Sequence, residues 1–82
     1  MNTIARVTTL TRVACRDEVN EVRVAAIRAL GSIARNAGNS VTERCQSIEG
    51  LKEVAVISKV SGNLEDGKLA TYELRRILRE YM

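Results

Sequence analysis

The side chains best suited to bind a partner gather late in this 82-residue chain. At helical spacing, one arc of the surface carries Lys68, Tyr72, Arg75, Arg76 and Arg79. Cations around an aromatic ring can bind phosphate groups, an acidic helix or a stacked base. Glu73 and Glu80 lie beside this arc, so an ordinary solvated outer face is the alternative. Arg28 and Arg35, on an earlier segment, extend the candidate surface only if the fold brings the two outer faces together.

Residues for catalysis are scarce. The chain has no histidine, which removes the commonest general base, the Ser–His and Cys–His pairs, and zinc sites that need histidine. Cys15 and Cys45 are too few for a structural zinc site or a disulfide framework, and we expect free thiols that fill apolar space. Glu65 and Asp66 form an acidic pair at the start of a predicted helix, where the helix dipole favours negative charge. We therefore expect no enzymatic activity, no cofactor and no bound metal.

The composition favours helices packed closely together. Hydrophobic residues make up 45% of the chain, yet Phe, Trp and Pro are absent, so Val, Ile, Leu and Ala must build the core. The net charge of +3 is compatible with nucleic acid or with an acidic protein and requires neither. Arginines and threonines interrupt the first residues, unlike a signal peptide, and no apolar run approaches the ~20 residues of a membrane span. We expect a cytoplasmic protein without a membrane partner.

Hydrophobic periodicity predicts four helices, at about 3–15, 20–37, 41–61 and 64–81. Asp17 or Asn20 is expected to cap the second helix, and Ser40 with Glu43 fits a capping box for the third. The third segment is either one long helix or a helix bent near Gly50. The residues at 61–63 are expected to end it.

Each predicted helix has an apolar face that is expected to form the core. On the second helix this face is broad, so that helix needs neighbours on two sides; it contains Val22, Ala25, Ala26, Ala29, Leu30, Ile33 and Ala37. On the third helix the apolar residues are Val41, Cys45, Ile48, Leu51, Val54, Ile57 and Val60. On the fourth they are Ala70, Leu74, Ile77, Leu78 and Tyr81.

A shift of the chain by 47 residues aligns its two halves. Seven pairs of large apolar residues then coincide, in two helices and across their turn: Ile4–Leu51, Val7–Val54, Leu10–Ile57, Val13–Val60, Val22–Leu69, Ile27–Leu74 and Leu30–Ile77. This register predicts a single domain, residues 1–82, made of two helical repeats at about 1–38 and 39–82. The alternative is a four-helix bundle without repeats, in which the apolar residues coincide by chance.

The stretch DEVNEVRVAAIRALGSIA, residues 17–34, resembles the second half of a HEAT-type repeat, particularly the short variety found in phycobilin lyases. The matching residues are Asp17, Val22-Arg23, Ala25-Ala26, Ala29-Leu30-Gly31 and Ile33. The resemblance implies that Asp17 binds amide protons of the turn and that Arg23 reaches the turn or an Asp of the adjacent repeat. The second half departs from the pattern, because the equivalent positions hold Leu64, Ala70 and Leu78.

Together these features predict an all-α protein of two helical hairpins, either stacked as HEAT-like repeats or closed into a small bundle. The predicted function is a protein–protein interaction module or adaptor without catalytic activity. Its partner is another protein or a second copy of the chain in a homodimer. The alternative is a nucleic-acid-binding protein that uses the basic face of the last helix.

Overall fold

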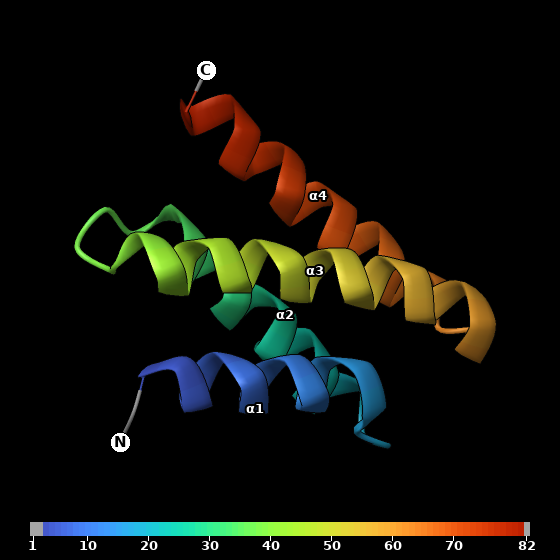
Figure 1. Ribbon diagram of the computed structural model, residues 1–82. Helices are drawn as coiled ribbons and strands as arrows, with labels where there is room; N and C mark the ends of the chain where they lie inside the picture. The colour runs from blue at the N-terminus through green and yellow to red at the C-terminus, as the bar shows by residue number, and fades with distance from the viewer. Residues whose placement is uncertain (1–2, 82) are drawn as a thin grey trace.

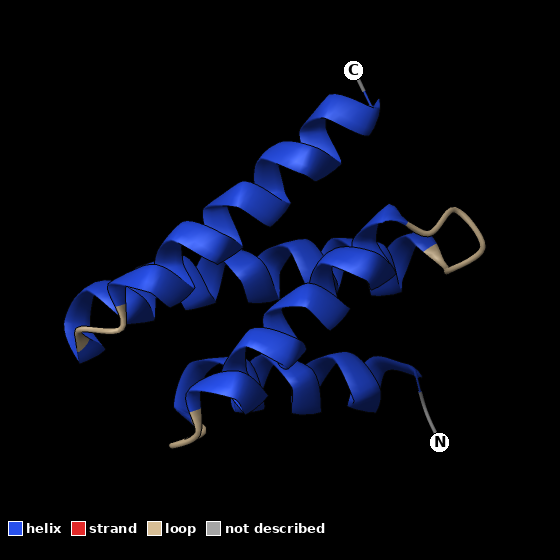
Figure 2. Ribbon diagram, turned by 180° about the vertical axis from the view of Figure 1, so that it is seen from behind, coloured by secondary structure: helices blue, strands red, loops and turns tan. Residues whose placement is uncertain are grey.

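The computed structural model describes residues 3–81, with side chains described for residues 5–80, and contains four α-helices (Figure 1). Their bounds are α1 (Thr3–Arg16), α2 (Asn20–Arg35), α3 (Val41–Ser61) and α4 (Leu64–Tyr81). No strand occurs in this range, so the all-α prediction is confirmed (Figure 2). The predicted side-chain contacts of Ile4 and Tyr81 lie outside the described side chains.

The helix ends follow local hydrogen bonding. Ser40 Oγ accepts a bond from the amide of Glu43 at 3.2 Å, which confirms Ser40 as the cap of α3. The prediction for α2 was wrong, because its cap is Val19, which offers no side-chain bond. The carboxylate of Asp17 instead accepts from the amide of Val19 at 2.8 Å and shapes the turn. α3 runs as one helix through Gly50 and ends at Gly62, whose φ of 84° is left-handed.

The helices form two layers. α1 and α3 lie side by side in one layer, nearest the viewer in Figure 1, and α2 and α4 form the other, nearest the viewer in Figure 2. The chain measures 33 × 31 × 18 Å, and its shortest dimension suits two layers of helices about 10 Å across. α2 and α3 each contact every other helix, whereas α1 and α4 share no contact within residues 3–81. The α1–α2 and α3–α4 hairpins therefore stack as an open two-layer bundle.

The hydrophobic core lies where α2 crosses the other helices. Ile27, Leu30 and Leu51 have no exposed surface. The other buried apolar residues come from all four helices: Val7, Ala14, Cys15, Ala26, Ile33, Ala34, Val54, Ala70 and Ile77. Since α2 supplies five members of this core, its expected burial on more than one side is confirmed.

The predicted inner face of α3 was wrong at both ends. Val60 is 88% exposed, Val41 and Cys45 are also exposed, and Glu43 and Ser47 are buried instead. The predicted apolar residues mostly recur at three-residue steps, and each such step falls about 60° short of a full helical turn. The run therefore winds around the helix. Only its middle part faces the core.

Four further apolar residues were assigned to the core wrongly. Leu78 on α4, Val22 and Ala25 on α2, and Ala37, which lies beyond the end of α2, are exposed. No other helix of residues 3–81 covers them. A helical pattern marks an apolar flank but not whether a neighbouring helix is present to cover it.

Two glycines allow the hairpins to approach closely. A Cβ atom on Gly50 would collide with Thr11 Oγ1, so this glycine lets α3 lie against α1. A Cβ atom on Gly31 would lie 2.8–3.0 Å from the carboxylate of Glu73. The glycine of the Ala-Leu-Gly sequence therefore makes room for a buried side chain of α4. Both contacts join the first hairpin to the second.

Candidate functional site

A buried ion pair connects the first turn to α4. Arg23 Nε donates to Asp66 Oδ2 at 2.6 Å, and the two side chains are only 10% and 4% exposed. Arg23 Nη1 also donates to the carbonyl oxygen of Asp17 at 2.8 Å, and Nη2 donates to Asn20 Oδ1 at 3.3 Å. One guanidinium thus joins the turn before α2 to the first turn of α4. Arg23 was expected to reach the turn or an Asp of the adjacent repeat, but the sequence did not identify Asp66, placed at a helix start, as that residue.

Beside this pair, the outer flanks of α2 and α4 form a groove of about 390 Å³. Its lining comes from both hairpins: Arg28, Ser32, Arg35, Leu69, Tyr72, Glu73 and Arg76. The fold therefore brings Arg28 and Arg35 of α2 together with Tyr72 and Arg76 of α4, as the sequence required for an extended basic surface. Leu69 adds an apolar contact to the groove wall.

Glu73 is the residue of this groove that sequence reasoning missed. It is 3% exposed, although it was expected beside a solvated face. Its Oε1 lies 4.0 Å from Arg35 Nη2 and its Oε2 lies 3.8 Å from Arg76 Nη1, and Oε2 accepts no hydrogen bond from the described residues. The guanidinium of Arg76 also lies 5.8 Å from the ring centroid of Tyr72. The carboxylate thus offsets one of three arginine charges and leaves the groove positive.

The remaining residues of the predicted arc lie elsewhere on α4. Lys68 and Arg75 line a second groove, of about 500 Å³, between α3 and α4. Tyr72 lines both grooves, so it stands on the ridge between them. Arg79 is exposed and lines neither groove. The single arc seen in the sequence is therefore divided between two flanks of the helix.

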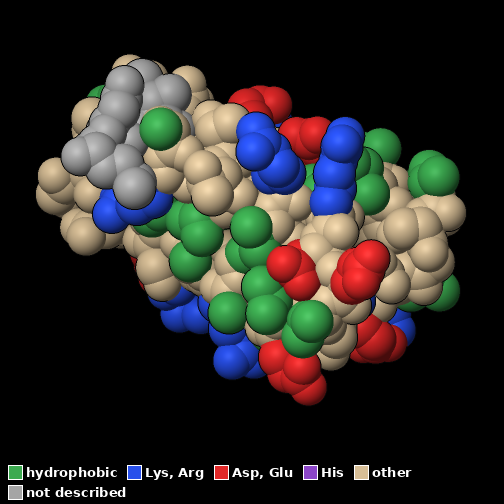
Figure 3. Space-filling view, turned by 90° about the horizontal axis from the view of Figure 1, so that it is seen from below, with side chains coloured by type: hydrophobic (Ala, Val, Ile, Leu, Met, Phe, Trp, Pro, Cys, Tyr) green, Lys and Arg blue, Asp and Glu red, His purple; other side chains and the backbone are tan. Residues whose placement is uncertain are grey.

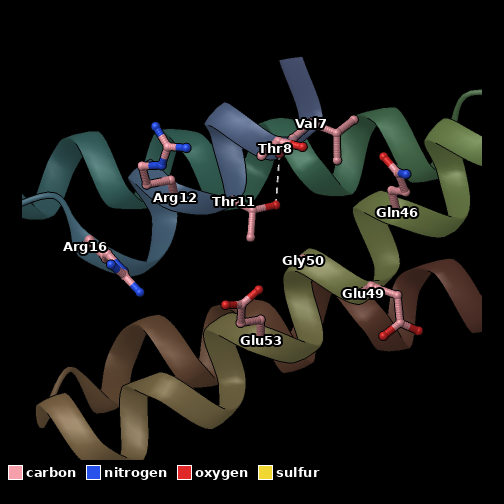
Figure 4. Close-up of a pocket in the computed structure, with 9 residues that line it drawn as sticks. All are labelled: Val7, Thr8, Thr11, Arg12, Arg16, Gln46, Glu49, Gly50 and Glu53. Atoms are coloured by element: carbon pink, nitrogen blue, oxygen red, sulfur yellow. Dashed lines mark hydrogen bonds between the residues drawn. The ribbon is translucent and has the colours of Figure 1, made fainter. Parts of the chain in front are cut away.

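A third groove, of about 390 Å³, separates α1 from α3 (Figure 4). Thr11 and Glu53 point into the space between the helices, and Thr11 Oγ1 donates to the carbonyl oxygen of Val7 at 2.9 Å. Two arginines of α1 and two glutamates of α3 line it: Arg12, Arg16, Glu49 and Glu53. Their charges balance, so this groove lacks the positive excess of the groove between α2 and α4.

The two cysteines occupy different environments, and both are free thiols. Cys15 is buried and Cys45 is exposed. Burial raises the pKa of the Cys15 thiol, the negative charge of Glu53 adds to this effect, and the positive charge of Arg16 opposes it. Among the side chains that the structure describes, no group of three or more His, Cys, Asp or Glu residues is placed to hold a metal ion.

We expect iodoacetamide to alkylate Cys45 at least about tenfold faster than Cys15 at pH 8, because the thiolate reacts and Cys15 is both shielded and protonated. Mass spectrometry of timed samples measures both rates, and unfolding in urea should make them similar. The raised pKa also stabilises the fold below the ordinary thiol pKa, and this contribution is lost as the pH rises through the raised value. Equal rates in the folded chain would contradict the assignment.

The helices carry charged residues along their exposed flanks. Within residues 3–81, none of them combines the length and the apolar character that a membrane crossing needs. Comparisons of the chain with protein-family models, with curated proteins and with solved structures found no match.

Proposed function

We propose that this chain is a small interaction module that binds an acidic segment of a partner protein between α2 and α4. The observation that supports it is the meeting of Arg28, Arg35, Arg76 and Tyr72 in one groove. These residues come from different hairpins, and α2 and α4 lie side by side in Figure 2. A site assembled in this way depends on the fold, which is typical of a recognition surface more than of a solvated helix face.

The chemistry of the groove suits carboxylates. Guanidinium groups bind carboxylates through paired, charge-assisted hydrogen bonds, and Arg28 is exposed to an incoming ligand. Glu73 lies between Arg35 and Arg76 and holds both cations near the groove. Tyr72 offers an aromatic face with a polar tip, a residue type enriched at protein interfaces.

Nucleic acid is the weaker candidate. A bound strand needs cations that follow successive phosphates, but here Lys68 and Arg75 are separated from Arg28 and Arg76 by the ridge of α4. The buried carboxylate of Glu73 would also lie close to any phosphate in the groove and repel it. The flexible side chains of an acidic protein segment can reach around that carboxylate.

We further propose that the module is a pair of HEAT-like repeats, as the resemblance of residues 17–34 implies. Two features favour this assignment: Arg23 reaches an Asp of the next hairpin, and the first and last helices stay apart. In such an arrangement the second helices of the hairpins form one layer. The proposed binding groove lies in that layer.

The test uses a fluorescein-labelled peptide of alternating Glu and Asp residues and measures its fluorescence anisotropy at low salt. We expect Arg28→Gln with Arg76→Gln to weaken binding about tenfold or more, since each lost charge-assisted bond contributes ~1.5 kcal/mol. The matched control, Arg12→Gln with Lys52→Gln, removes the same charge from α1 and α3, outside this groove. It should retain binding within about twofold, and added salt should weaken binding of the wild type.

Absence of peptide binding at low salt would contradict the proposal, as would equal losses in the two double variants. A single-stranded oligonucleotide of equal charge serves as the competing probe. Tighter binding of the oligonucleotide, lost in the groove variant, would overturn the acidic-protein assignment in favour of nucleic acid. Circular dichroism establishes that each variant keeps its helices.

A further inference from the structure

We infer that copies of this chain associate head to tail, so that the α1–α2 hairpin of one copy packs on the α3–α4 hairpin of the next. The inference concerns the two ends of the stack and does not depend on what binds between α2 and α4. The lower edge is the uncovered flank of α1 and α2 that contains Leu10, Val13, Val19 and Val22. The upper edge is the uncovered flank of α3 and α4 that contains Leu64, Thr71 and Leu78.

Each residue that the second hairpin packs against the first can be compared with the residue 47 positions earlier, on the lower edge. Leu69 packs on the core and lines the groove that α4 forms with α2. The residue 47 positions earlier is Val22, which is 41% exposed. Asp66 is buried against Arg23, and its counterpart Val19 is 49% exposed. At these two positions the lower edge thus presents in the open what the second hairpin covers against the first. The counterparts of Ala70 and Glu73, which are Arg23 and Ala26, are buried.

The upper edge corresponds to the surface that receives the second hairpin. In the first hairpin, Thr11 meets Gly50 and Gly31 meets Glu73. The residues 47 positions later are Ser58 and Leu78. Ser58 lines the groove of about 500 Å³ between α3 and α4 but is itself only 4% exposed, whereas Leu78 is 60% exposed. Of these two counterparts, Leu78 therefore lies uncovered at this end.

Leu64 and small side chains give the upper groove its apolar character. Leu64 is 60% exposed at the groove wall, beside Ala55, Gly67 and Thr71. Hydrophobic side chains also gather on the opposite end of the stack, which Figure 3 shows from below. Both ends thus offer apolar surface that association would remove from water.

The charges near the turns of the two edges are complementary. Asp17, Glu18 and Glu21 lie at the turn between α1 and α2, and both acidic and basic side chains stand beside the hydrophobic ones in Figure 3. The upper groove is lined by Lys59 and Lys68 near the turn between α3 and α4 and by Arg75 farther along α4. Both turns lie on the same side of the molecule, at the right in Figure 1. Stacking one copy on another therefore places the acidic turn over the basic groove, which favours a second copy over an unrelated partner.

Because the two edges differ, the contact is heterologous. A copy that has bound through its lower edge still presents a free upper edge, so association continues into chains or closes into rings. A two-fold dimer, in which one edge meets itself, would instead bring like charges together. The expected product is a series of oligomers that grow with concentration.

The test combines sedimentation velocity with two edge variants. Wild-type chain should exceed the mass of a dimer as its concentration rises. Val22→Glu blocks the lower edge and Leu64→Glu blocks the upper edge, and both positions are exposed enough to keep the fold. Each variant alone should stay monomeric over the range in which the wild type associates. Their equimolar mixture should form a dimer and nothing larger, because only one intact pair of edges remains.

The matched control is Val56→Glu, which adds the same charge at an exposed valine of α3 that does not line the groove between α3 and α4. It should associate as the wild type does. A wild-type chain that stays monomeric at ~1 mM, a threshold for weak association, would overturn the inference. Dimers of either single variant, or a mixture that stays monomeric, would also overturn it.

This experiment separates the inference from the proposed function. Arg28→Gln with Arg76→Gln should associate like the wild type, since neither residue lies on an edge. Val22→Glu and Leu64→Glu should bind the acidic peptide as monomers with little change. Loss of association with intact peptide binding would therefore contradict the head-to-tail contact alone.

Discussion

Replacing Arg23 by methionine should lower the free energy of unfolding by about 3–5 kcal/mol, because it leaves the carboxylate of Asp66 buried without its partner. The change also removes the bonds that Arg23 donates to Asp17 and Asn20 in the turn. A domain of this size is typically stable by only ~5–15 kcal/mol, so much of the chain should be unfolded at moderate urea concentrations. Urea denaturation followed by circular dichroism measures the loss.

Two variants separate the cost of the unpaired charge from simple loss of a side chain. Arg23→Met combined with Asp66→Leu removes both charges and should recover most of the stability, because buried ion pairs replaced by apolar residues are often neutral. Lys68→Met breaks the exposed pair with Glu65 and should leave the unfolding midpoint unchanged within error. A double variant as unstable as Arg23→Met would show that the charge of Asp66 is not the cause.

The second large effect is expected at Leu30, which has no exposed surface and lies at the crossing of α2 and α3. Leu30→Ala should reduce the free energy of unfolding by about 2–5 kcal/mol, through lost burial and the cavity left behind. Chemical denaturation at low protein concentration measures it without interference from association. We expect the cavity to stay open, because α2 and α3 are both long helices that cannot easily move into the space that Leu30 leaves.

Leu78→Ala provides the matched control, since the same atoms are removed from a leucine that is mostly exposed. Its effect should lie within about 0.5 kcal/mol, as for most surface substitutions. Similar losses at Leu30 and Leu78 would mean that the core is not centred on α2. The same outcome would weaken the distinction between covered and uncovered edges.

The four helices were predictable from local sequence, whereas the buried side of each helix was predictable only in part. Breaks at 36–40 and 62–63 and the cap at Ser40 depend on neighbouring residues alone. The inner face of α3 depends on which helices surround it. Ser47 can be buried there because its Oγ donates to the carbonyl of Glu43 at 2.9 Å, which satisfies the hydroxyl within its own helix. Hydrophobicity alone gives no sign of such a residue.

The candidate site was predictable as a set of residues but not as a shape. Arg28, Arg35 and Tyr72 were recognised as partner-binding candidates, yet their meeting depends on how the hairpins stack. The burial of Glu73 was not predictable from α4, since the space that admits its carboxylate is created by Gly31 on another helix. A glycine in the middle of an otherwise regular helix was the one available signal.

The absence of contact between α1 and α4 has a consequence for local opening. Either outer helix can fray or detach while the other keeps all its neighbours, so the opening of one end leaves the opposite end protected. Amide hydrogens in α2 and α3 should accordingly exchange with solvent most slowly, because those two helices touch every other one. The amide hydrogens of the two central helices should therefore exchange slowly, while α1 and α4 open locally and independently of each other.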